Sequence, residues 1–103
     1  MTIRLDENNI INFLHNFNKK HIREGKHSNY RSKQRKILFD DIIMFLTLEF
    51  PVQIEQQETK KFALIYHYHG EYYIYIVIAI KDKFINIVTQ YMFNRSKKRE
   101  LLK

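Results

Sequence analysis

Hydrophobic residues dominate one stretch of the chain, residues 72–91, which reads YYIYIVIAI-KDK-FINIVTQY. Its first nine residues, Tyr72–Ile80, are almost all β-branched or aromatic, as is typical of a buried strand. They are too few to span a bilayer as a helix. A second strand is expected over residues 84–91, after a turn at Asp82 and Lys83. The pattern therefore predicts an antiparallel hairpin around which the fold is organised.

The alternation of side chains predicts the register of this hairpin. A two-residue turn places four pairs on one face, namely Ile80 with Ile85, Ile78 with Ile87, Ile76 with Thr89 and Ile74 with Tyr91. The other face then carries Tyr73, Tyr75, Val77 and Ala79 beside Asn86, Val88 and Gln90. A slip of one residue would mix the two sets, which favours this pairing. One face is expected to be core and to include Tyr91, and the other to be aromatic and polar.

Two helices are predicted before the sheet. Apolar residues recur at helical spacing from residue 7 to residue 18, with an extension to Arg23 as an alternative. Asp6 is the expected N-terminal cap, and Gly25 is the expected stop. A second helix of about fourteen residues is expected to begin near Ile37 and to end before Pro51, because the residue before a proline is pushed out of the helical region.

Two further strands are predicted between the second helix and the hairpin. Residues 52–57 form a short edge strand with Val52 and Ile54 facing inward, and residues 60–67 form the next strand. The connection through His69 and Gly70 leaves two alternatives open. A two-residue loop places His67 on the isoleucine face, whereas a three-residue loop places it on the aromatic face.

These elements predict an α+β fold with one domain over residues 1–103. Two N-terminal helices pack on one face of a four-stranded antiparallel meander, and residues 92–103 form a basic tail. The N-terminus lacks the apolar segment of a secretory signal, and the chain has no cysteine. We therefore expect a cytoplasmic protein with no membrane partner.

The net charge of +7 is concentrated in two segments. Residues 15–36 hold eight Lys and Arg against one Glu, and residues 92–103 hold five against one. The residues between them, 37–91, are mildly acidic, with four Lys against seven Asp and Glu. This asymmetry favours a polyanionic partner over a general need for solubility.

Basic side chains interleaved with Tyr, His and Asn suit nucleic acid, because Lys and Arg contact phosphates while aromatic rings stack on unpaired bases. The candidate binding residues are Lys19, Lys20, Lys26, Tyr30, Arg31, Lys33, Arg35 and Lys97. RNA is favoured over DNA as the ligand. The alternatives are a solvated basic face and a surface for an acidic protein.

The aromatic face of the hairpin also has two interpretations. Tyr73 and Tyr75 could stack on bases while Asn86 and Gln90 read base edges. The simpler interpretation is a covered face, either in a homodimer or under the C-terminal segment, because exposed aromatic patches on small domains usually mark a contact.

Several kinds of active site are excluded by composition. Without cysteine there is no thiol nucleophile, and with two glycines there is no phosphate-binding glycine loop. His67 and His69, two residues apart on a strand, are the strongest metal candidates, but a solvated pair is the favoured interpretation. No metal and no cofactor are expected.

Three short segments resemble the RelE/ParE-like toxins. They are HIREG at residues 21–25, the strand pair KFALIYHYHGEYYIYIVIAI at residues 61–80, and the ending INIVTQYMFNRSKK at residues 85–98. In that family the last strand commonly ends in I-x-T-x-Y followed by basic residues. Here the corresponding segment is Val88–Tyr91, followed by Arg95 and Lys97.

This resemblance implies a metal-independent endoribonuclease that cleaves messenger RNA and is neutralised by an acidic antitoxin. Attack of the ribose 2′-hydroxyl on the adjacent phosphate needs a base, an acid and cations around the phosphorane. The candidates for these roles are His21, His67 and Tyr91 for proton transfer, and Arg23, Arg31 and Arg95 for charge stabilisation. The sheet nearly lacks arginine, which departs from the family pattern.

Three hypotheses for function follow. The first is a toxin-like endoribonuclease with a basic cleft between residues 15–36 and the C-terminal end of the sheet. The second is a non-catalytic nucleic-acid-binding protein of viral or plasmid origin. The third is a dimeric protein-interaction module that uses the Tyr73 and Tyr75 face.

Overall fold

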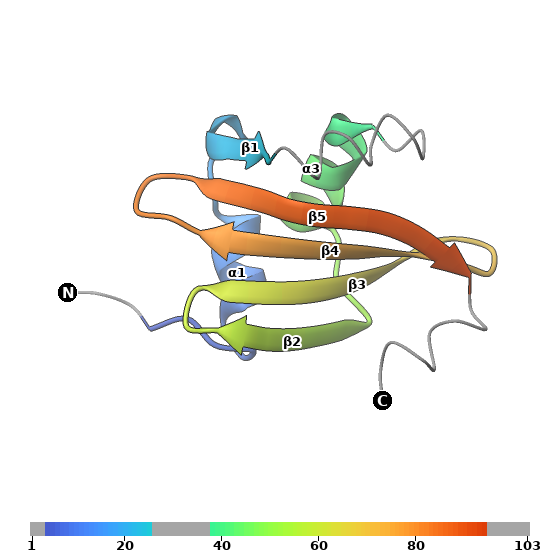
Figure 1. Cartoon of the computed structure of the whole chain (residues 1–103), viewed down its shortest axis with the longest axis horizontal. Coiled ribbons are helices and arrows are strands. Elements are labelled where there is room, and N and C mark those ends of the chain that lie inside the picture. The colour runs from blue at the N-terminus through green and yellow to red at the C-terminus, as the bar shows by residue number, and fades with distance from the viewer. Residues whose placement is uncertain (1–3, 26–37, 95–103) are drawn as a thin grey trace.

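The structure is a computed structural model that describes residues 4–25 and 38–94. Its elements in chain order are α1 (Ile10–His15), the 3-10 helix η1 (Lys19–His21), β1 (Ile22–Glu24), α3 (Phe39–Leu48), β2 (Gln53–Glu58), β3 (Lys61–His69), β4 (Tyr72–Ile80) and β5 (Ile85–Asn94). The five strands form one sheet in the order β1-β5-β4-β3-β2. Both α-helices lie on the same face of this sheet (Figure 1).

The predicted α+β class is confirmed, and so is the antiparallel meander of β2, β3, β4 and β5. The sheet has a fifth strand that the sequence pattern did not reveal. β1 pairs in parallel with β5, with Ile22 opposite Ile85 and Glu24 opposite Ile87. The sheet is therefore mixed rather than purely antiparallel.

The first helix is shorter than predicted. The predicted cap at Asp6 is wrong, because the N-cap of α1 is Asn9; the Asp6 carboxylate instead accepts from the backbone N–H groups of Asn8 and Asn9 in the turn that precedes the helix. α1 ends at His15, and the extension to Arg23 is wrong. Asn18 caps the following 3-10 turn instead, accepting from the N–H of Lys20 at 3.0 Å. Asparagine side chains compete with helical hydrogen bonds in this way, which frees Ile22 to be buried in the sheet.

The second helix and the strands next to it follow the predicted order. α3 ends at Leu48, and Pro51 lies three residues further on. The β2 side chain of Ile54 faces inward as expected, whereas Val52 was expected inward but lies before the strand and is 49% exposed. β5 continues to Asn94, so residues 92–94 belong to the sheet and not to the predicted tail.

The predicted register of β4 and β5 is correct near the turn and wrong beyond it. Ile80 pairs with Ile85 and Ile78 with Ile87, and the N–H of Lys81 donates to the carbonyl of Phe84 at 2.8 Å. Val88 then forms a β-bulge, because Val77 pairs with Thr89. An extra residue in one strand reverses the faces of everything that follows it.

The bulge moves the second half of β5 onto the faces opposite to those predicted. Ile76 pairs with Gln90 and Ile74 with Met92, so these β5 side chains face the helices. Gln90 is fully buried there. Tyr91 pairs with Tyr75 on the other face, and its predicted place on the isoleucine side is wrong.

The β3–β4 connection settles the position of His67. Only Gly70 and Glu71 separate the two strands, and Gly70 adopts a left-handed conformation (φ 56°) that suits a residue without a Cβ. A two-residue loop alone would place His67 on the isoleucine face, but a register shift between His67 and His69 moves His67 to the other face. His67 pairs with Tyr73 and therefore lies on the aromatic face.

The hydrophobic core fills the space between the helices and one face of the sheet. Its buried members are Ile10, Leu14, Ile22, Ile42, Phe45, Leu46, Phe62, Leu64, Tyr66, Ile74, Ile76, Ile78, Ile80, Ile85 and Ile87. The isoleucine face predicted to be core is confirmed for β4 and for the start of β5.

Tyr66 is a core residue whose hydroxyl has no hydrogen-bond partner within the described ranges. Burial, and to a smaller extent Glu49, raises the pKa of this phenol, so it stays protonated. Because an unsatisfied buried hydroxyl costs about 1–3 kcal/mol, we expect Tyr66→Phe to maintain or increase stability, by up to ~2 kcal/mol. Urea unfolding would measure this, with the exposed Tyr72→Phe as a control expected to change little. A clear loss of stability in Tyr66→Phe would contradict the prediction.

Candidate nucleic-acid interface

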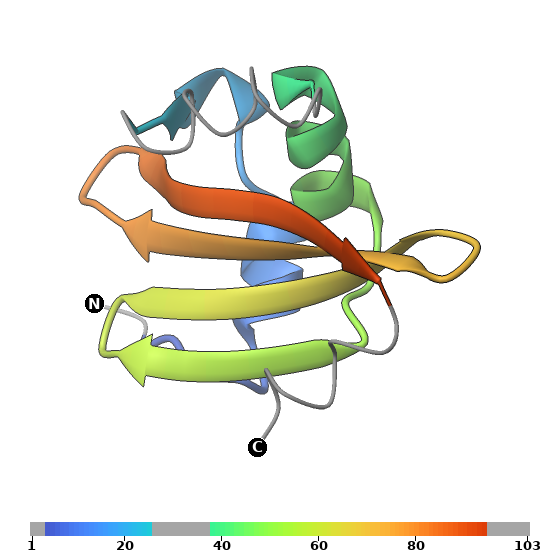
Figure 2. The same cartoon turned by 45° about the vertical axis from the view of Figure 1, so that its right-hand side comes forward.

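No described helix covers the sheet face opposite the core, which we call the open face (Figure 1 and Figure 2). Strand alternation and pairing give its members in the central strands as Lys61, Ala63, Ile65 and His67 from β3, Tyr73, Tyr75, Val77 and Ala79 from β4, and Asn86, Thr89, Tyr91 and Phe93 from β5. Ala63, Ile65, Val77 and Phe93 are buried, but they lie outside the core cluster. The open face is therefore a second packed surface, on which rings and small side chains lie together.

Five aromatic rings form a continuous row on the open face, and we call them the aromatic row. The ring centroid of Tyr73 lies 5.4 Å from that of His67 and 5.8 Å from that of Phe93, with the Phe93 ring stacked at 23°. Tyr91 then lies 6.3 Å from Phe93 and 5.0 Å from Tyr75. These separations lie within the usual range for aromatic pairs, so the rings support one another.

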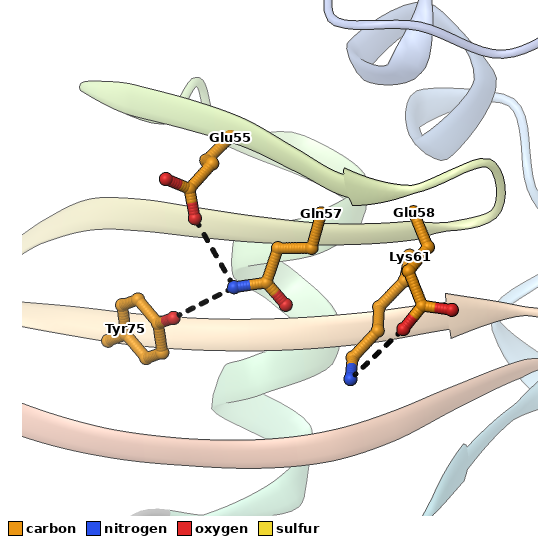
Figure 3. A network of polar contacts seen from close by, with 5 residues as sticks. All are labelled: Glu55, Gln57, Glu58, Lys61 and Tyr75. Atoms are coloured by element: carbon orange, nitrogen blue, oxygen red, sulfur yellow. Dashed lines mark hydrogen bonds and ion pairs between the residues drawn. The ribbon is translucent and has the colours of Figure 1, made fainter.

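The Tyr75 end of the row is held by a side chain that reaches across the sheet from β2. Gln57 on β2 donates through its amide nitrogen to the hydroxyl of Tyr75 on β4 and to a carboxylate oxygen of Glu55, at 3.4 and 3.3 Å (Figure 3). β3 lies between these strands, and Ala63 pairs with Glu55 on one side and Val77 on the other. A small side chain at Ala63 leaves room for this bridge, which orients the Tyr75 ring.

An open groove of about 1180 Å³ lies on the same face beyond the Tyr75 end of the row, beside the β2–β3 and β4–β5 turns. Its charged lining residues are Arg23, Lys60, Lys61, Lys81, Lys83, Glu58 and Asp82, and its other lining residues include Ala79, Asn86 and Val88. Five cations against two carboxylates make the groove basic. One ion pair occurs in it, Lys61 Nζ to Glu58 Oε2 at 3.6 Å (Figure 3).

Arg23 is the groove cation with the most defined position. Its guanidinium carbon lies 4.2 Å from the centroid of the Phe84 ring. Its backbone is part of β1 and pairs with Asn86. A cation held over an aromatic face keeps its N–H groups available to a further acceptor, and a planar guanidinium matches phosphate geometry.

Gly25 keeps β1 close to β5. Its N–H donates to the carbonyl of Ile87 at 3.0 Å, and a Cβ at this position would lie only 2.8 Å from that carbonyl oxygen. Backbone atoms cannot move aside as a flexible side chain can. Gly25 was predicted as a helix stop, and its observed role is this close approach.

We expect Gly25→Ala to displace β1 and with it Arg23, at a cost of about 1–3 kcal/mol in stability. The amide resonances of Arg23 and Ile85 should shift in NMR spectra. Gly70→Ala is the matched control, because it strains a left-handed turn at the other end of the sheet and has no atom within 4 Å of the added Cβ. Equal shifts near Ile85 in both variants would contradict this account.

The predicted catalytic residues do not form one cluster. Arg23 lies beside Asn86, whereas His67 lies near the other end of the sheet, across Tyr73 from Phe93. Phe93 lies seven positions after Asn86 on β5, which with the bulge at Val88 corresponds to about 20 Å. Tyr91 lies between these ends, and His21 is exposed on η1. His67 contacts the carbonyl of Gly70 through its Nε2 at 3.0 Å.

Most of the predicted nucleic-acid-binding residues lie outside the described residues. This group comprises Lys26, Tyr30, Arg31, Lys33, Arg35 and Lys97, and the catalytic candidate Arg95 belongs to it as well. Lys19 and Lys20 are described, and both are exposed on η1. Of the segment 15–36 that was expected to form one wall of the basic cleft, the structure describes only residues 15–25.

Three comparisons with known proteins bear on identity. No protein-family model, curated protein or solved structure matches this chain. The RelE/ParE-like relationship therefore stays a prediction. Among the described residues, no helix is long and apolar enough to cross a membrane, and no group of three or more His, Cys, Asp or Glu is placed to hold a metal ion.

The sequence pattern missed the groove and one ring of the row. The pattern predicts Lys81 and Lys83 as parts of the connection between two strands, Phe84 as the first residue of the second strand and Phe93 as part of the tail. The one sequence signal for the groove is the Lys-Asp-Lys turn next to Phe84, at the end of a strongly apolar hairpin. Nothing local to that turn indicates that Arg23, about sixty residues earlier, lies against it.

Proposed function

We propose that this protein binds single-stranded nucleic acid on its open face, without cleaving it. The observation that supports this most is the aromatic row, five rings in mutual contact on a sheet face that no described helix covers. RNA is the favoured ligand, and a second copy of the chain as a further partner stays a prediction.

Stacking explains why a row of rings suits unpaired bases. Every base has an aromatic face, and stacking on a protein ring contributes about 1–3 kcal/mol per base with little dependence on sequence. Tyr73, Tyr75 and Tyr91 are each partly exposed, and the rings of their neighbours in the row fix their positions. A paired duplex cannot offer its base faces, so single strands are the preferred ligand.

The separation of the catalytic candidates favours binding over cleavage. A phosphoryl-transfer site needs its base, acid and cation within hydrogen-bond reach of one phosphate. Here Arg23 and His67 are about 20 Å apart along the sheet. The toxin-like ribonuclease is therefore the weaker of the two proposals, and it would need residues beyond the described ranges to supply its centre.

Fluorescence anisotropy with labelled oligonucleotides tests the proposal. We expect single-stranded RNA and DNA to bind and the matching duplexes to bind at least tenfold more weakly. Affinity should fall with salt, since the net charge is +7 and each phosphate contact to a single strand contributes about −0.7 to the slope of log affinity against log salt.

The same samples distinguish the alternatives. Electrophoresis of the RNA after incubation, with and without EDTA, should show intact RNA. Metal-independent cleavage would instead support the ribonuclease hypothesis. Equal affinity for single strands and duplexes would mean that charge alone drives binding and would exclude a role for the rings.

A further inference from the structure

The basic groove lies on the same face as the aromatic row but shares no residue with it. We infer that the groove is a separate phosphate-binding subsite, so that one nucleic-acid strand places its backbone in the groove and its bases on the row. This inference rests on the proposed function for the strand as a whole. The phosphate chemistry of the groove can nevertheless be tested on its own.

The lining of the groove provides both charge and a defined anchor for a phosphate. Lys81 and Lys83 stand on the β4–β5 turn, and Lys60 and Lys61 stand at the β2–β3 turn, so cations approach from two sides. Arg23 adds a guanidinium whose position is set by the Phe84 ring. A planar guanidinium among point-charge ammonium groups is a common arrangement for phosphodiester recognition.

The floor of the groove leaves space for a ligand. Ala79 and Val88 are short or branched apolar residues, and Asn86 provides an amide with both donor and acceptor groups. The chain has only two alanines, Ala63 and Ala79, and both lie on the open face of adjacent strands. The small side chain of Ala79 leaves space in the groove, whereas Ala63 is buried beside the Gln57 bridge.

The β-bulge at Val88 connects the two subsites. Before the bulge, Asn86 lines the groove. After the bulge, Tyr91 and Phe93 lie on the same face and form part of the aromatic row. Without the extra residue, Gln90 would occupy the open face in place of Tyr91. Bulges are frequent beside functional sites because they redirect side chains in this way.

The spacing of the subsites sets the length of the ligand. Ala79 lies four positions after Tyr75 on β4, which corresponds to about 13 Å along the strand. Glu55 and Glu58 lie on β2, at the edge of the open face, and would repel a phosphate backbone there. The favoured path therefore runs from the groove along β4 and β5, and it requires several nucleotides rather than one.

Tripolyphosphate, which has no base, probes the groove alone. In NMR titrations we expect it to shift the amides of residues 81–86 and of Arg23 and to leave Tyr73 and Phe93 unchanged. An oligouridine of eight nucleotides should shift both sets. If tripolyphosphate leaves the amides of residues 81–86 unshifted, the inference is wrong.

A matched pair of arginine variants gives the quantitative test. Arg23→Gln is expected to weaken tripolyphosphate binding at least fivefold and to reduce the salt slope for the oligouridine by about 0.7. Arg4→Gln makes the same change at an exposed arginine that does not line the groove, and it should resemble the parent protein. Lys83→Gln should weaken tripolyphosphate binding as Arg23→Gln does. Because Lys83 lies on the β4–β5 turn, its effect cannot come from a loss of the β1–β5 pairing.

The outcomes separate the two proposals. If both groove variants match Arg4→Gln while the oligouridine still shifts the aromatic row, the subsite is wrong and the proposed function stands. If tripolyphosphate binds the groove in an Arg23-dependent way but no oligonucleotide binds, the subsite stands and the proposed function fails.

Discussion

Replacing Tyr73 and Tyr91 together by alanine is expected to weaken the binding of single-stranded RNA by about 30-fold or more. Each ring lost removes about 1–3 kcal/mol of base stacking, and every 1.4 kcal/mol is a factor of ten in affinity. These two tyrosines also flank Phe93 in the row, so their loss removes the support of a third ring. Anisotropy titration of labelled RNA measures the change.

Two controls separate stacking from folding. The double change Tyr73→Phe and Tyr91→Phe keeps both rings and should retain most of the affinity. Tyr72→Ala removes an exposed tyrosine that neighbours Tyr73 but belongs to no pair of the row, and it should leave affinity unchanged. A thermal melt confirms that each variant is folded. If a folded double alanine variant binds as tightly as the parent, the open face is not the interface.

Local patterns were sufficient to predict most of the sheet. The run of β-branched and aromatic residues in Tyr72–Ile80 defines β4 to the residue, and the Asp82–Lys83 turn fixes the pairing of Ile80 with Ile85. Both depend on neighbours in sequence. The same is true of the end of α3 ahead of Pro51.

Features that depend on distant residues were not predicted. β1 has only three residues, and it becomes a strand because β5 offers an unpaired edge beside Ile85. The segment looks like the end of an amphipathic helix when it is read alone. Parallel pairing between strands so far apart leaves no periodic signal, so Arg23 could be predicted as functional but not placed against Phe84.

The β-bulge at Val88 accounts for the largest difference between the predicted and the observed candidate site. A single extra residue moved Tyr91 from the expected core face to the open face and moved Gln90 the other way. The sequence around it contains no glycine or proline that would indicate an irregular strand. The predicted aromatic face was correct for Tyr73 and Tyr75, but its partners on β5 are Phe93 and Tyr91 rather than Val88 and Gln90.

Replacing Gln90 by glutamate is expected to make stability strongly dependent on pH. Gln90 is fully buried on the helix-facing side of β5, and the substitution keeps its shape while adding a titratable carboxyl. Burial disfavours the charged form, so the pKa of the introduced carboxyl should rise above its value in the unfolded chain, about 4.3. Its neutral form then resembles glutamine, and the variant should approach the parent in stability near pH 4.

Raising the pH ionises this carboxyl in the unfolded chain before it does so in the folded protein. The stability of Gln90→Glu relative to the parent should therefore be retained below about pH 4 and fall as pH rises toward the folded-state pKa. At 1.36 kcal/mol per unit of pH, the loss by pH 7 can reach about 3–4 kcal/mol. Urea unfolding of both proteins between pH 4 and pH 7 measures the difference.

Tyr91→Glu is the matched control, because it introduces the same carboxyl one residue away on the open face. Tyr91 is half-buried among rings, so its substitution should cost some packing at every pH but add much less pH dependence than Gln90→Glu. The register without a bulge predicts the reverse, since it places Tyr91 in the core and Gln90 outside. A stronger pH dependence in Tyr91→Glu than in Gln90→Glu would therefore refute the bulge at Val88 and, with it, the continuity of the aromatic row.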